Sequence, residues 1–480
     1  MVTTGLVAID ATILATAVPT IVGELGGFSS FPWLFSIYLL TQAVSVPIYS
    51  KLADTVGRKP VVLLGIALFL TGSVLCGFAW SMPMLIAFRA VQGLGAGAVQ
   101  PMAITIAGDI YTVAERAKAQ AYIASVWAVS SVVGPTLGGI FSEFVSWRWI
   151  FFVNIPLCFA AAWLLIRFLH ETVERKPHRI DWAGGGLLTV SMSLLILGLL
   201  EGGNAWAWDA PQSIGAFVVG TLLFLAFIRV EQTAAEPVLP LWVFTRRLLL
   251  AASMIAVAVG VILIGLTSYV PSFLEALLHV SPLTSGLALA ALTIGWPITA
   301  SQSGRLYLRY GFRFTALVGS VVAVVGVAAL VWVSTDPSVI GVALSCLVVG
   351  GGLGLTSSPT LIAAQSSVGW GDRAVVTGAN LFSRSMGSAV GVAVLGAVIN
   401  GRMDGQTAVQ APSQFGDAVT VAFVVVLGVA LAMVVAAAAM PRTTTEHVHV
   451  GSTGGKDEAT SQVVGDTVVD EAKDFLDKQK

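Results

Sequence analysis

Three charged side chains lie inside long apolar stretches of the sequence, where charge is least expected. Asp10 and Arg89 fall in the first half of the chain and Arg384 in the second. A charge at the centre of a bilayer costs about 2.5 to 3.5 kcal/mol on insertion scales, so each of them needs a partner or a water-filled cavity. A carboxylate in such a place can take up and release a proton, and a nearby arginine favours its ionised form. We therefore predict that Asp10 and Arg89 form a proton-coupling pair; the alternative is a purely structural ion pair.

Three further charged residues are secondary candidates. Arg384 either couples to the gate or is no more than a snorkelling or interhelical hydrogen-bonding residue. Asp109 and Glu275 lie near the ends of apolar stretches, where they are the next carboxylates that could couple a proton. The histidines form no metal-spaced pair and no nucleophile-base pair, so we expect neither a metal site nor an enzyme. Without a phosphate-binding loop, we expect no cofactor, and the energy for any transport would come from an ion gradient.

The elements that position these residues are long apolar segments. Hydrophobic residues make up 56% and charged residues 11% of the 480, with a mean hydropathy of +0.87, whereas soluble domains carry roughly 25% charged residues. Segments of about 17 to 25 apolar residues can cross a bilayer as helices. We predict fourteen such segments, at residues 4–22, 32–50, 61–79, 85–107, 120–141, 149–169, 183–200, 213–230, 248–273, 284–302, 314–333, 339–364, 376–399 and 417–440. The lipid bilayer is therefore the expected surrounding, and no nucleic-acid partner is expected.

The distribution of basic residues sets the predicted orientation. Lys and Arg concentrate in alternate loops, beginning with the loop at 51–59, and such loops stay on the cytoplasmic side. An even number of segments then places both termini in the cytoplasm of a multi-pass plasma-membrane protein. The first segment lacks a basic leader region, so we interpret it as a retained helix rather than a cleaved signal. The three cysteines, Cys76, Cys158 and Cys346, all fall in apolar segments and indicate no disulfide framework.

An internal repeat divides the chain. Residues 50–59, SKLADTVGRK, return 254 residues later as 304–313, GRLYLRYGFR, with Gly57 on Gly311. The sequence also aligns Gly93 with Gly351, and residues 115–117 with 372–374. Segments one to six thus repeat as nine to fourteen, and segments seven and eight are an insertion. Many secondary transporters are built from such repeats.

The repeat predicts a 6 + 2 + 6 arrangement in four parts. These are an N-terminal six-helix bundle at 1–170, a two-helix insertion with its linkers at 171–247, a C-terminal six-helix bundle at 248–440, and a cytoplasmic tail at 441–480. The tail is polar and rich in acidic residues, so we expect it to be disordered and without an essential role.

Several motifs carry a family resemblance that extends from residue 5 to about 440. The loop at 51–59 resembles the signature of the major facilitator superfamily, and 89–95 (RAVQGLG) and 133–139 (VGPTLGG) are similar to its fourth-helix motif and its antiporter motif. The runs 9–13 (IDATI) and 147–156 (WRWIFFVNIP) resemble the fourteen-helix drug:proton antiporter branch. The resemblance implies an all-α membrane protein with the major facilitator fold and 14 transmembrane helices.

The resemblance also implies roles for two motifs, and each role has a simpler alternative. The loop residues Lys51, Asp54, Gly57, Arg58 and Lys59 would form a conformational latch, although a basic loop also serves to set topology. The antiporter-type helix, with Gly134, Pro135, Gly138 and Gly139, would bend and let a neighbour approach closely; helix packing alone is the alternative. Two departures from the pattern are Ser50, where glycine is usual, and Ala15, where asparagine is usual.

These observations together predict a proton-coupled antiporter. We expect a monomer that exports amphipathic small molecules such as drugs, dyes or antibiotics from the cytoplasm by alternating access, with the small molecule and protons as its partners. Two alternatives stay open. The same fold could export an endogenous lipid or secondary metabolite, or the chain could be a non-transporting membrane sensor or assembly partner.

Overall fold

A computed structural model describes residues 1–26, 33–169, 171, 181–202, 206–234, 237, 239–280, 282–403 and 411–442. Regular structure in these ranges is helical. The helices of the first half are α1 (Val2–Leu25), α2 (Trp33–Val56), α3 (Arg58–Gly77), α4 (Met82–Ile110), α5 (Val113–Phe144), α6 (Trp149–Phe152), α7 (Asn154–Phe168), α8 (Trp182–Glu201) and α9 (Pro211–Thr233). Those of the second half are α10 (Trp242–Thr245), α11 (Arg247–Leu278), α12 (Pro282–Tyr310), α13 (Phe312–Val333), α14 (Val339–Ser366), η2 (Trp370–Asp372), α15 (Arg373–Met403) and α16 (Pro412–Ala439).

Nine helical segments are long and apolar enough to cross a membrane, counting within the described ranges. They include α3, α4, α9, α11, α13, α14 and α16, the first part of α2, and α6 together with α7. Shorter apolar helices occupy Val2–Leu14 and Ala183–Gly198. The helical membrane architecture agrees with the prediction from the sequence. The count of fourteen spans stays a prediction, and the predicted tail lies outside the described residues from 443 onward.

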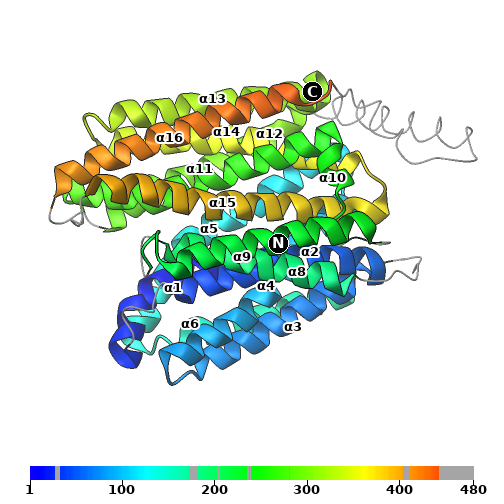
Figure 1. Cartoon of the computed structure of the whole chain (residues 1–480), viewed down its shortest axis with the longest axis horizontal. Coiled ribbons are helices and arrows are strands. Elements are labelled where there is room, and N and C mark those ends of the chain that lie inside the picture. The colour runs from blue at the N-terminus through cyan, green and yellow to red at the C-terminus, as the bar shows by residue number, and fades with distance from the viewer. Residues whose placement is uncertain are drawn as a thin grey trace, which may run out of the picture. The chain divides into compact units, whose positions relative to one another are not determined.

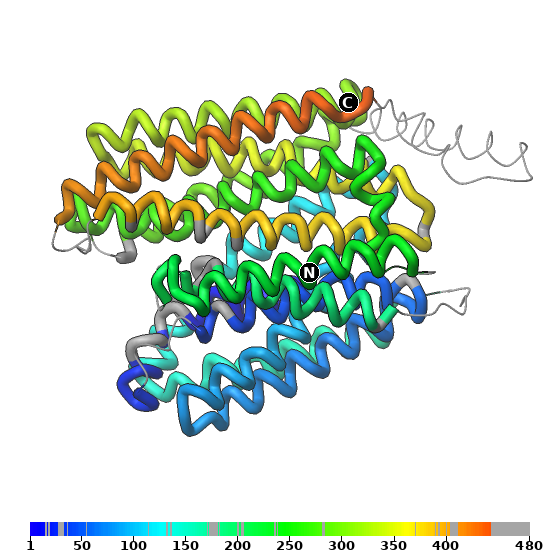
Figure 2. Tube along the Cα trace, viewed as in Figure 1, coloured from blue at the N-terminus to red at the C-terminus, as the bar shows by residue number. Residues whose placement is uncertain are grey.

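The chain divides into two compact units. The N-terminal unit comprises 1–106 and 126–241, and the C-terminal unit comprises 107–125 and 242 onward. In the first unit α8 packs on α9 and α2, and α3 packs on α7; in the second, α14 packs against α12 and α13 while α11 lies along α15 and α16 (Figure 1). The exchanged segment 107–125 joins the end of α4 to the start of α5 (Figure 2). This exchange was not foreseen from the sequence.

Single glycines make the two repeated turns. Gly57 alone separates α2 from α3, and Gly311 alone separates α12 from α13. Their backbone angles are nearly the same, φ 104° and ψ 158° at Gly57 and φ 86° and ψ 162° at Gly311. This region of backbone space is essentially restricted to glycine, because a Cβ would clash there. The structure therefore confirms the alignment of Gly57 with Gly311 and gives its physical reason.

Glycine-mediated packing extends the repeat and corrects one detail of it. A Cβ on Gly95 would overlap the backbone of Phe69, and a Cβ on Gly352 would overlap that of Ala323. Phe69 and Ala323 are 254 residues apart, like the two turns, whereas Gly95 and Gly352 are 257 apart. Gly93 therefore corresponds to Gly350. The alignment of Gly93 with Gly351 was wrong by one residue, because a run of three glycines offers no side chain that fixes the register.

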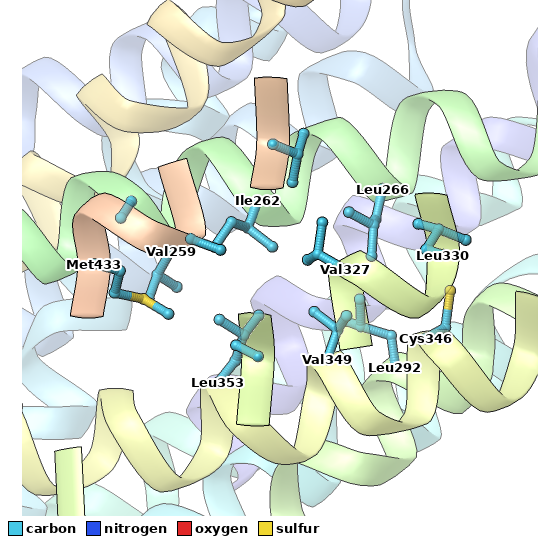
Figure 3. Packing of buried hydrophobic residues seen from close by; sticks show 14 of the residues in the cluster. Val259, Ile262, Leu266, Leu292, Val327, Leu330, Cys346, Val349, Leu353 and Met433 are labelled. Carbon is cyan, nitrogen blue, oxygen red and sulfur yellow. The ribbon is translucent and has the colours of Figure 1, made fainter. Parts of the chain in front are cut away.

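An apolar core fills the C-terminal unit. Leu292, Cys346 and Val349 lie in it almost completely buried, among side chains from α11, α13 and α16 (Figure 3). The register of the repeat maps Tyr38, Arg89 and Gln92 of the N-terminal unit onto these same three positions, at spacings of 254 and 257. One unit thus holds a polar group where the other holds a hydrophobic core.

Candidate functional site

A buried carboxylate in α1 is the centre of the polar group. The Asp10 side chain is 1% exposed, and three donors from two other helices surround it. Arg89 of α4 donates to its Oδ2 at 2.7 Å, while Gln92 of α4 and Asn154 at the start of α7 donate to its Oδ1 at 2.7 and 3.0 Å. The predicted proximity of Asp10 and Arg89 is confirmed.

Arg89 has partners besides Asp10. Its Nε donates to the carbonyl of Leu34 at 3.2 Å and its Nη1 donates to Oε1 of Gln92 at 2.8 Å. The guanidinium carbon lies 4.2 Å above the centre of the Tyr38 ring, an arrangement in which the ring face attracts a cation. The guanidinium is therefore held on several sides, and loss of the Asp10 charge would not leave it without acceptors.

Asn154 connects the carboxylate to α3. Its Nδ2 donates to Oγ of Ser73 at 2.9 Å as well as to Asp10, and Ser73 donates to the carbonyl of Phe151. Among the described residues, Oδ1 of Asn154 is buried and has no hydrogen-bond partner. An unused buried acceptor beside a carboxylate is where the proton of a carboxylic acid could be received.

Sequence reasoning missed most of this group. Gln92 and Asn154 lie within motifs that were singled out, but neither was given a role, and Tyr38 and Ser73 were not singled out at all. The signal that was available is weak: an uncharged polar residue in an apolar stretch costs little, so it stands out far less than Asp10 does.

The first residues of the run 147–156 contact Glu24, near the C-terminal end of α1. Trp147 donates its indole N–H to Glu24 at 2.6 Å, Arg148 forms an ion pair with the same carboxylate, and the Arg148 guanidinium stacks 4.4 Å above the Trp147 ring. Hydrogen bonds from Arg148 and Trp147 lower the pKa of Glu24 below its usual range. The motif therefore ties the end of α1 to the same segment that delivers Asn154 to Asp10.

The predicted latch residues lie at the turn between α2 and α3. Arg58 is buried, and the backbone N–H groups of Arg58 and Lys59 donate to the carboxylate of Glu171 at 2.8 and 2.9 Å. The Lys59 ammonium donates to the carbonyls of Ile166 and Leu169 at the end of α7. A carboxylate at a helix N-terminus is stabilising because it faces the positive end of the dipole. Glu171 was not predicted, since it falls in a linker.

The two remaining predicted latch residues are Lys51 and Asp54. Lys51 is half-buried, and its carbonyl accepts a hydrogen bond from Thr55 within α2. The side chain of Asp54 lies outside the described side chains, so its predicted contact with Arg58 stays a prediction.

A reciprocal exchange of arginines ties residues 107–125 to the rest of the C-terminal unit. Arg116 at the start of α5 donates to Oγ of Ser366 at 2.8 Å, and Arg373 at the start of α15 donates to the carbonyl of Gly108 at 3.4 Å. Arg116 and Arg373 occupy equivalent positions of the repeat. Burial, together with the charge of Arg373, lowers the pKa of Arg116 to about 10.

One ion pair breaks the symmetry of this exchange. Arg373 also lies 3.2 Å from the Asp109 carboxylate, which places this secondary candidate at the arginine exchange rather than with Asp10. In the same unit, Tyr307 of α12 donates a short hydrogen bond to the carbonyl of Val113. Glu275, another secondary candidate, accepts a hydrogen bond from Ser285 at 2.6 Å, near the junction of α11 and α12.

The antiporter-type glycines behave differently from one another. A Cβ on Gly134 would overlap Thr12 of α1, so close packing at that position is confirmed. Gly138 is buried, whereas a Cβ on Gly139 would meet nothing within 4 Å. The predicted flat face therefore extends to Gly134 but not to Gly139. Residue 135 lies inside α5, and its side chain is outside the described ones.

Arg384, the remaining candidate, lies in α15. It is half-buried and belongs to the C-terminal unit, whereas the group around Asp10 belongs to the N-terminal unit. Across the described part of the chain, no three His, Cys, Asp or Glu side chains cluster as metal ligands would.

Comparison with known proteins gives a consistent result. Residues 1–392 match the Major Facilitator Superfamily. A multidrug transporter protein of Bacillus subtilis, MdtP, is 35% identical over 395 residues, which are 82% of this chain and 73% of that protein. The efflux pump FUS6 of Gibberella moniliformis is 32% identical over 421 residues, covering 84% of this chain and 73% of its own length.

A solved structure has the same fold. The crystal structure of the human organic anion transporter MFSD10 superposes with a TM-score of 0.65, covering 91% of this chain and 97% of that one at 15% sequence identity. At this identity the likeness concerns the fold alone.

Proposed function

This chain belongs to the major facilitator superfamily, and on that premise we propose that it is a proton-coupled antiporter that exports amphipathic small molecules, including drugs, from the cytoplasm. The observation that carries the proposal is a carboxylate, Asp10, that is 1% exposed within the apolar first part of α1 and surrounded by three donors. Its relatives named as multidrug transporters and efflux pumps support the direction and the class of substrate. The ion pair with Arg89 offsets the free-energy cost of placing the Asp10 charge in the membrane. The position of Asp10 on α1 suits a residue that carries a proton.

The group around Asp10 provides for both protonation states. When the carboxylate is ionised, Arg89, Gln92 and Asn154 all donate to it. When it takes up a proton, half a turn of the Asn154 amide presents the unused Oδ1 as an acceptor, and Arg89 keeps the carbonyl of Leu34 and Oε1 of Gln92. In the transport cycle the proton enters from outside as the substrate leaves, and the carboxylate restored on the inner side favours rebinding of substrate.

Two features at the predicted cytoplasmic ends of the helices would control access to this group. The turn at Gly57, with Glu171 seated on the N-terminus of α3, and the arginine exchange between Arg116 and Arg373 would hold the cytoplasmic side closed while the outer side opens. Asp54 and Arg58 would complete the latch, and a bend at Pro135 would allow closure. We propose fourteen spans in a plasma membrane, cytoplasmic termini and a monomer.

Flux measurement tests the proposal directly. The purified full chain in liposomes should accumulate a substrate against its gradient when a pH gradient is imposed, and dissipating that gradient with a protonophore should stop accumulation. One charge moved across 100 mV corresponds to about 2.3 kcal/mol, so one proton supports only a modest accumulation of a neutral molecule. Facilitated flux that ignores the pH gradient would refute coupling but not transport.

The arginine exchange leads to a ranked prediction. Arg373→Gln should loosen the cytoplasmic closure more than Arg116→Gln, because among the described contacts Arg373, unlike Arg116, forms an ion pair with a carboxylate, that of Asp109, at 3.2 Å. Losing a charge-assisted contact of this kind costs roughly 1.5 to 3 kcal/mol, so we expect roughly tenfold faster modification of a cysteine placed at Ala107. A matched variant, Arg402→Gln at the other end of α15, should leave that rate unchanged. Equal rates for both arginine variants would contradict the ranking.

A further inference from the structure

Arg384 differs from every other charged residue of the C-terminal unit. Among the described residues of α11 to α16, it is the charged side chain that lies farthest from either end of its helix. It falls within 376–399, the stretch predicted to cross the membrane. Arg89 is its counterpart in the N-terminal unit only in chemistry, since the repeat places Cys346 at the position equivalent to Arg89.

Among the described residues, none supplies a counter-charge to Arg384. One turn to either side, Asn380 donates to the carbonyl of Ala252 and Ser388 donates to that of Gly260, both at 3.2 Å. These polar neighbours are thus engaged with α11. Within the described part of the chain, the Arg384 guanidinium makes no hydrogen bond and no ion pair. It remains half-buried rather than sealed.

The interior charges therefore do not balance. Asp10 and Arg89 neutralise one another at 2.7 Å. Of the three charged residues singled out within apolar stretches, Arg384 therefore remains as an unbalanced positive charge. An unpaired arginine within a membrane span is unfavourable, by about 2.5 to 3.5 kcal/mol when it lies at the centre, and its five N–H donors are suited to a carboxylate, sulfonate or phosphate group. A ligand that brings a negative charge would relieve this cost, whereas a cationic ligand would add to it.

We propose that Arg384 is a specificity-determining residue that selects amphipathic organic anions as the exported substrates. The proposal rests on the export function proposed above and narrows its substrate class. Exchange of a monoanion for an incoming proton moves two charges across the membrane in the same electrical sense. Transport of the anion should therefore respond to membrane potential as well as to the pH gradient, and each charge moved across roughly 60 mV contributes about tenfold to the limiting concentration ratio.

Three probes with one aromatic body test the inference. Pyrenebutyrate is a monoanion, pyrenebutanol is neutral and pyrenebutyltrimethylammonium is a monocation. Fluorescence titration of the purified full chain should give at least tenfold tighter binding of the anion than of the cation, since a charge-assisted contact of this type is worth about tenfold or more. Arg384→Gln should remove that preference and leave binding of pyrenebutanol unchanged, and Arg384→Lys should keep most of it.

Matched controls separate specificity from folding. Arg402→Gln removes an exposed arginine at the other end of α15 and should leave the anion preference intact. If Arg384→Gln does not fold, a competition experiment with the wild-type protein still tests the anion preference. In that experiment octanoate should displace pyrenebutyrate more strongly than octyltrimethylammonium does. Wild type that prefers the cation, or an anion preference that survives in Arg384→Gln, would overturn the inference.

The failure of this inference and the failure of the proposed function look different. Gradient-driven flux of all three probes without anion preference would support the export function and refute the specificity role of Arg384. Anion-selective binding without any gradient-driven flux would refute the export function and leave the preference of Arg384 for anions supported. A phospholipid head group carries the same chemistry as a free organic acid. Displacement of pyrenebutyrate by short-chain phosphatidylglycerol, but not by phosphatidylcholine, would assign the anion to a lipid, and no displacement by either would assign it to a free acid.

Discussion

Asp10→Asn is expected to abolish uphill, pH-driven efflux and to lower the stability of the protein. The substitution keeps the side-chain volume, but the new amide cannot be ionised, so no proton can be carried. It also turns one acceptor oxygen into a donor that faces Arg89, Gln92 and Asn154, which all donate at this position. Removing one partner of a buried ion pair costs about 3 to 5 kcal/mol. Flux in liposomes at equal protein density, together with a thermal unfolding curve, measures both effects.

A double variant separates the two effects. Asp10→Asn combined with Arg89→Gln removes both charges, so the buried guanidinium is no longer left without its counter-charge, and much of the lost stability should return. If Asp10 carries the proton, the double variant should fold and bind substrate but still fail to accumulate it against a gradient. Recovery of pH-driven accumulation in the double variant would show that the ion pair is structural and that coupling resides at another carboxylate.

Gly95→Ala is expected to prevent normal folding of the N-terminal unit. A Cβ on Gly95 would overlap the backbone of Phe69 and lie 2.6 Å from the carbonyl oxygen of Gly65. Backbone atoms cannot swing aside as a side chain can, so α3 and α4 would have to separate. Overpacking typically costs about 1 to 3 kcal/mol, occasionally more, and this position should lie at or above the upper end. The yield of monodisperse protein and the melting temperature are the measurements, with an expected drop of roughly 5 °C or more.

The chain itself offers the controls for this test. Gly352→Ala, at the equivalent position of the C-terminal unit, should be as damaging, because its Cβ would overlap the backbone of Ala323. Gly139→Ala should be neutral, since nothing lies within 4 Å of the added methyl group. A stable Gly95→Ala protein would mean that the two helices are less closely packed than the structure has them.

The sequence identified features that depend on a scarce residue type. Asp10 and Arg89 could be found because a charge within an apolar span is costly, and Gly57 and Gly311 because the turn they make is restricted to glycine. The helical membrane fold followed from composition and segment length in the same way. The count of fourteen spans and the four-part division of the chain stay predictions.

Features built from common residues were not visible in the sequence. Asn154 carries no charge, and Glu171 sits in a linker where acidic residues are ordinary, so nothing in the pattern marked them. The glycine run at 350–352 fitted two registers, and only its packing against α13 decided between them. The grouping of 107–125 with the C-terminal unit depends on contacts between residues some 250 positions apart, such as Arg116 and Ser366, which no local pattern encodes.

The one-sided placement of the polar group bears on how such a transporter could be re-engineered. The C-terminal unit holds the same helix geometry with Leu292, Cys346 and Val349 where the other unit holds Tyr38, Arg89 and Gln92 (Figure 3). If Asp10 carries the proton as proposed, copying those three side chains across, with a carboxylate on α11, would install a second such centre by substitutions at equivalent backbone positions. Such a variant would exchange two protons for each substrate molecule. The limiting concentration ratio of a neutral substrate would then rise with the square of the proton concentration ratio across the membrane. The apolar core of the C-terminal unit thus marks the positions at which a change of proton stoichiometry could be engineered.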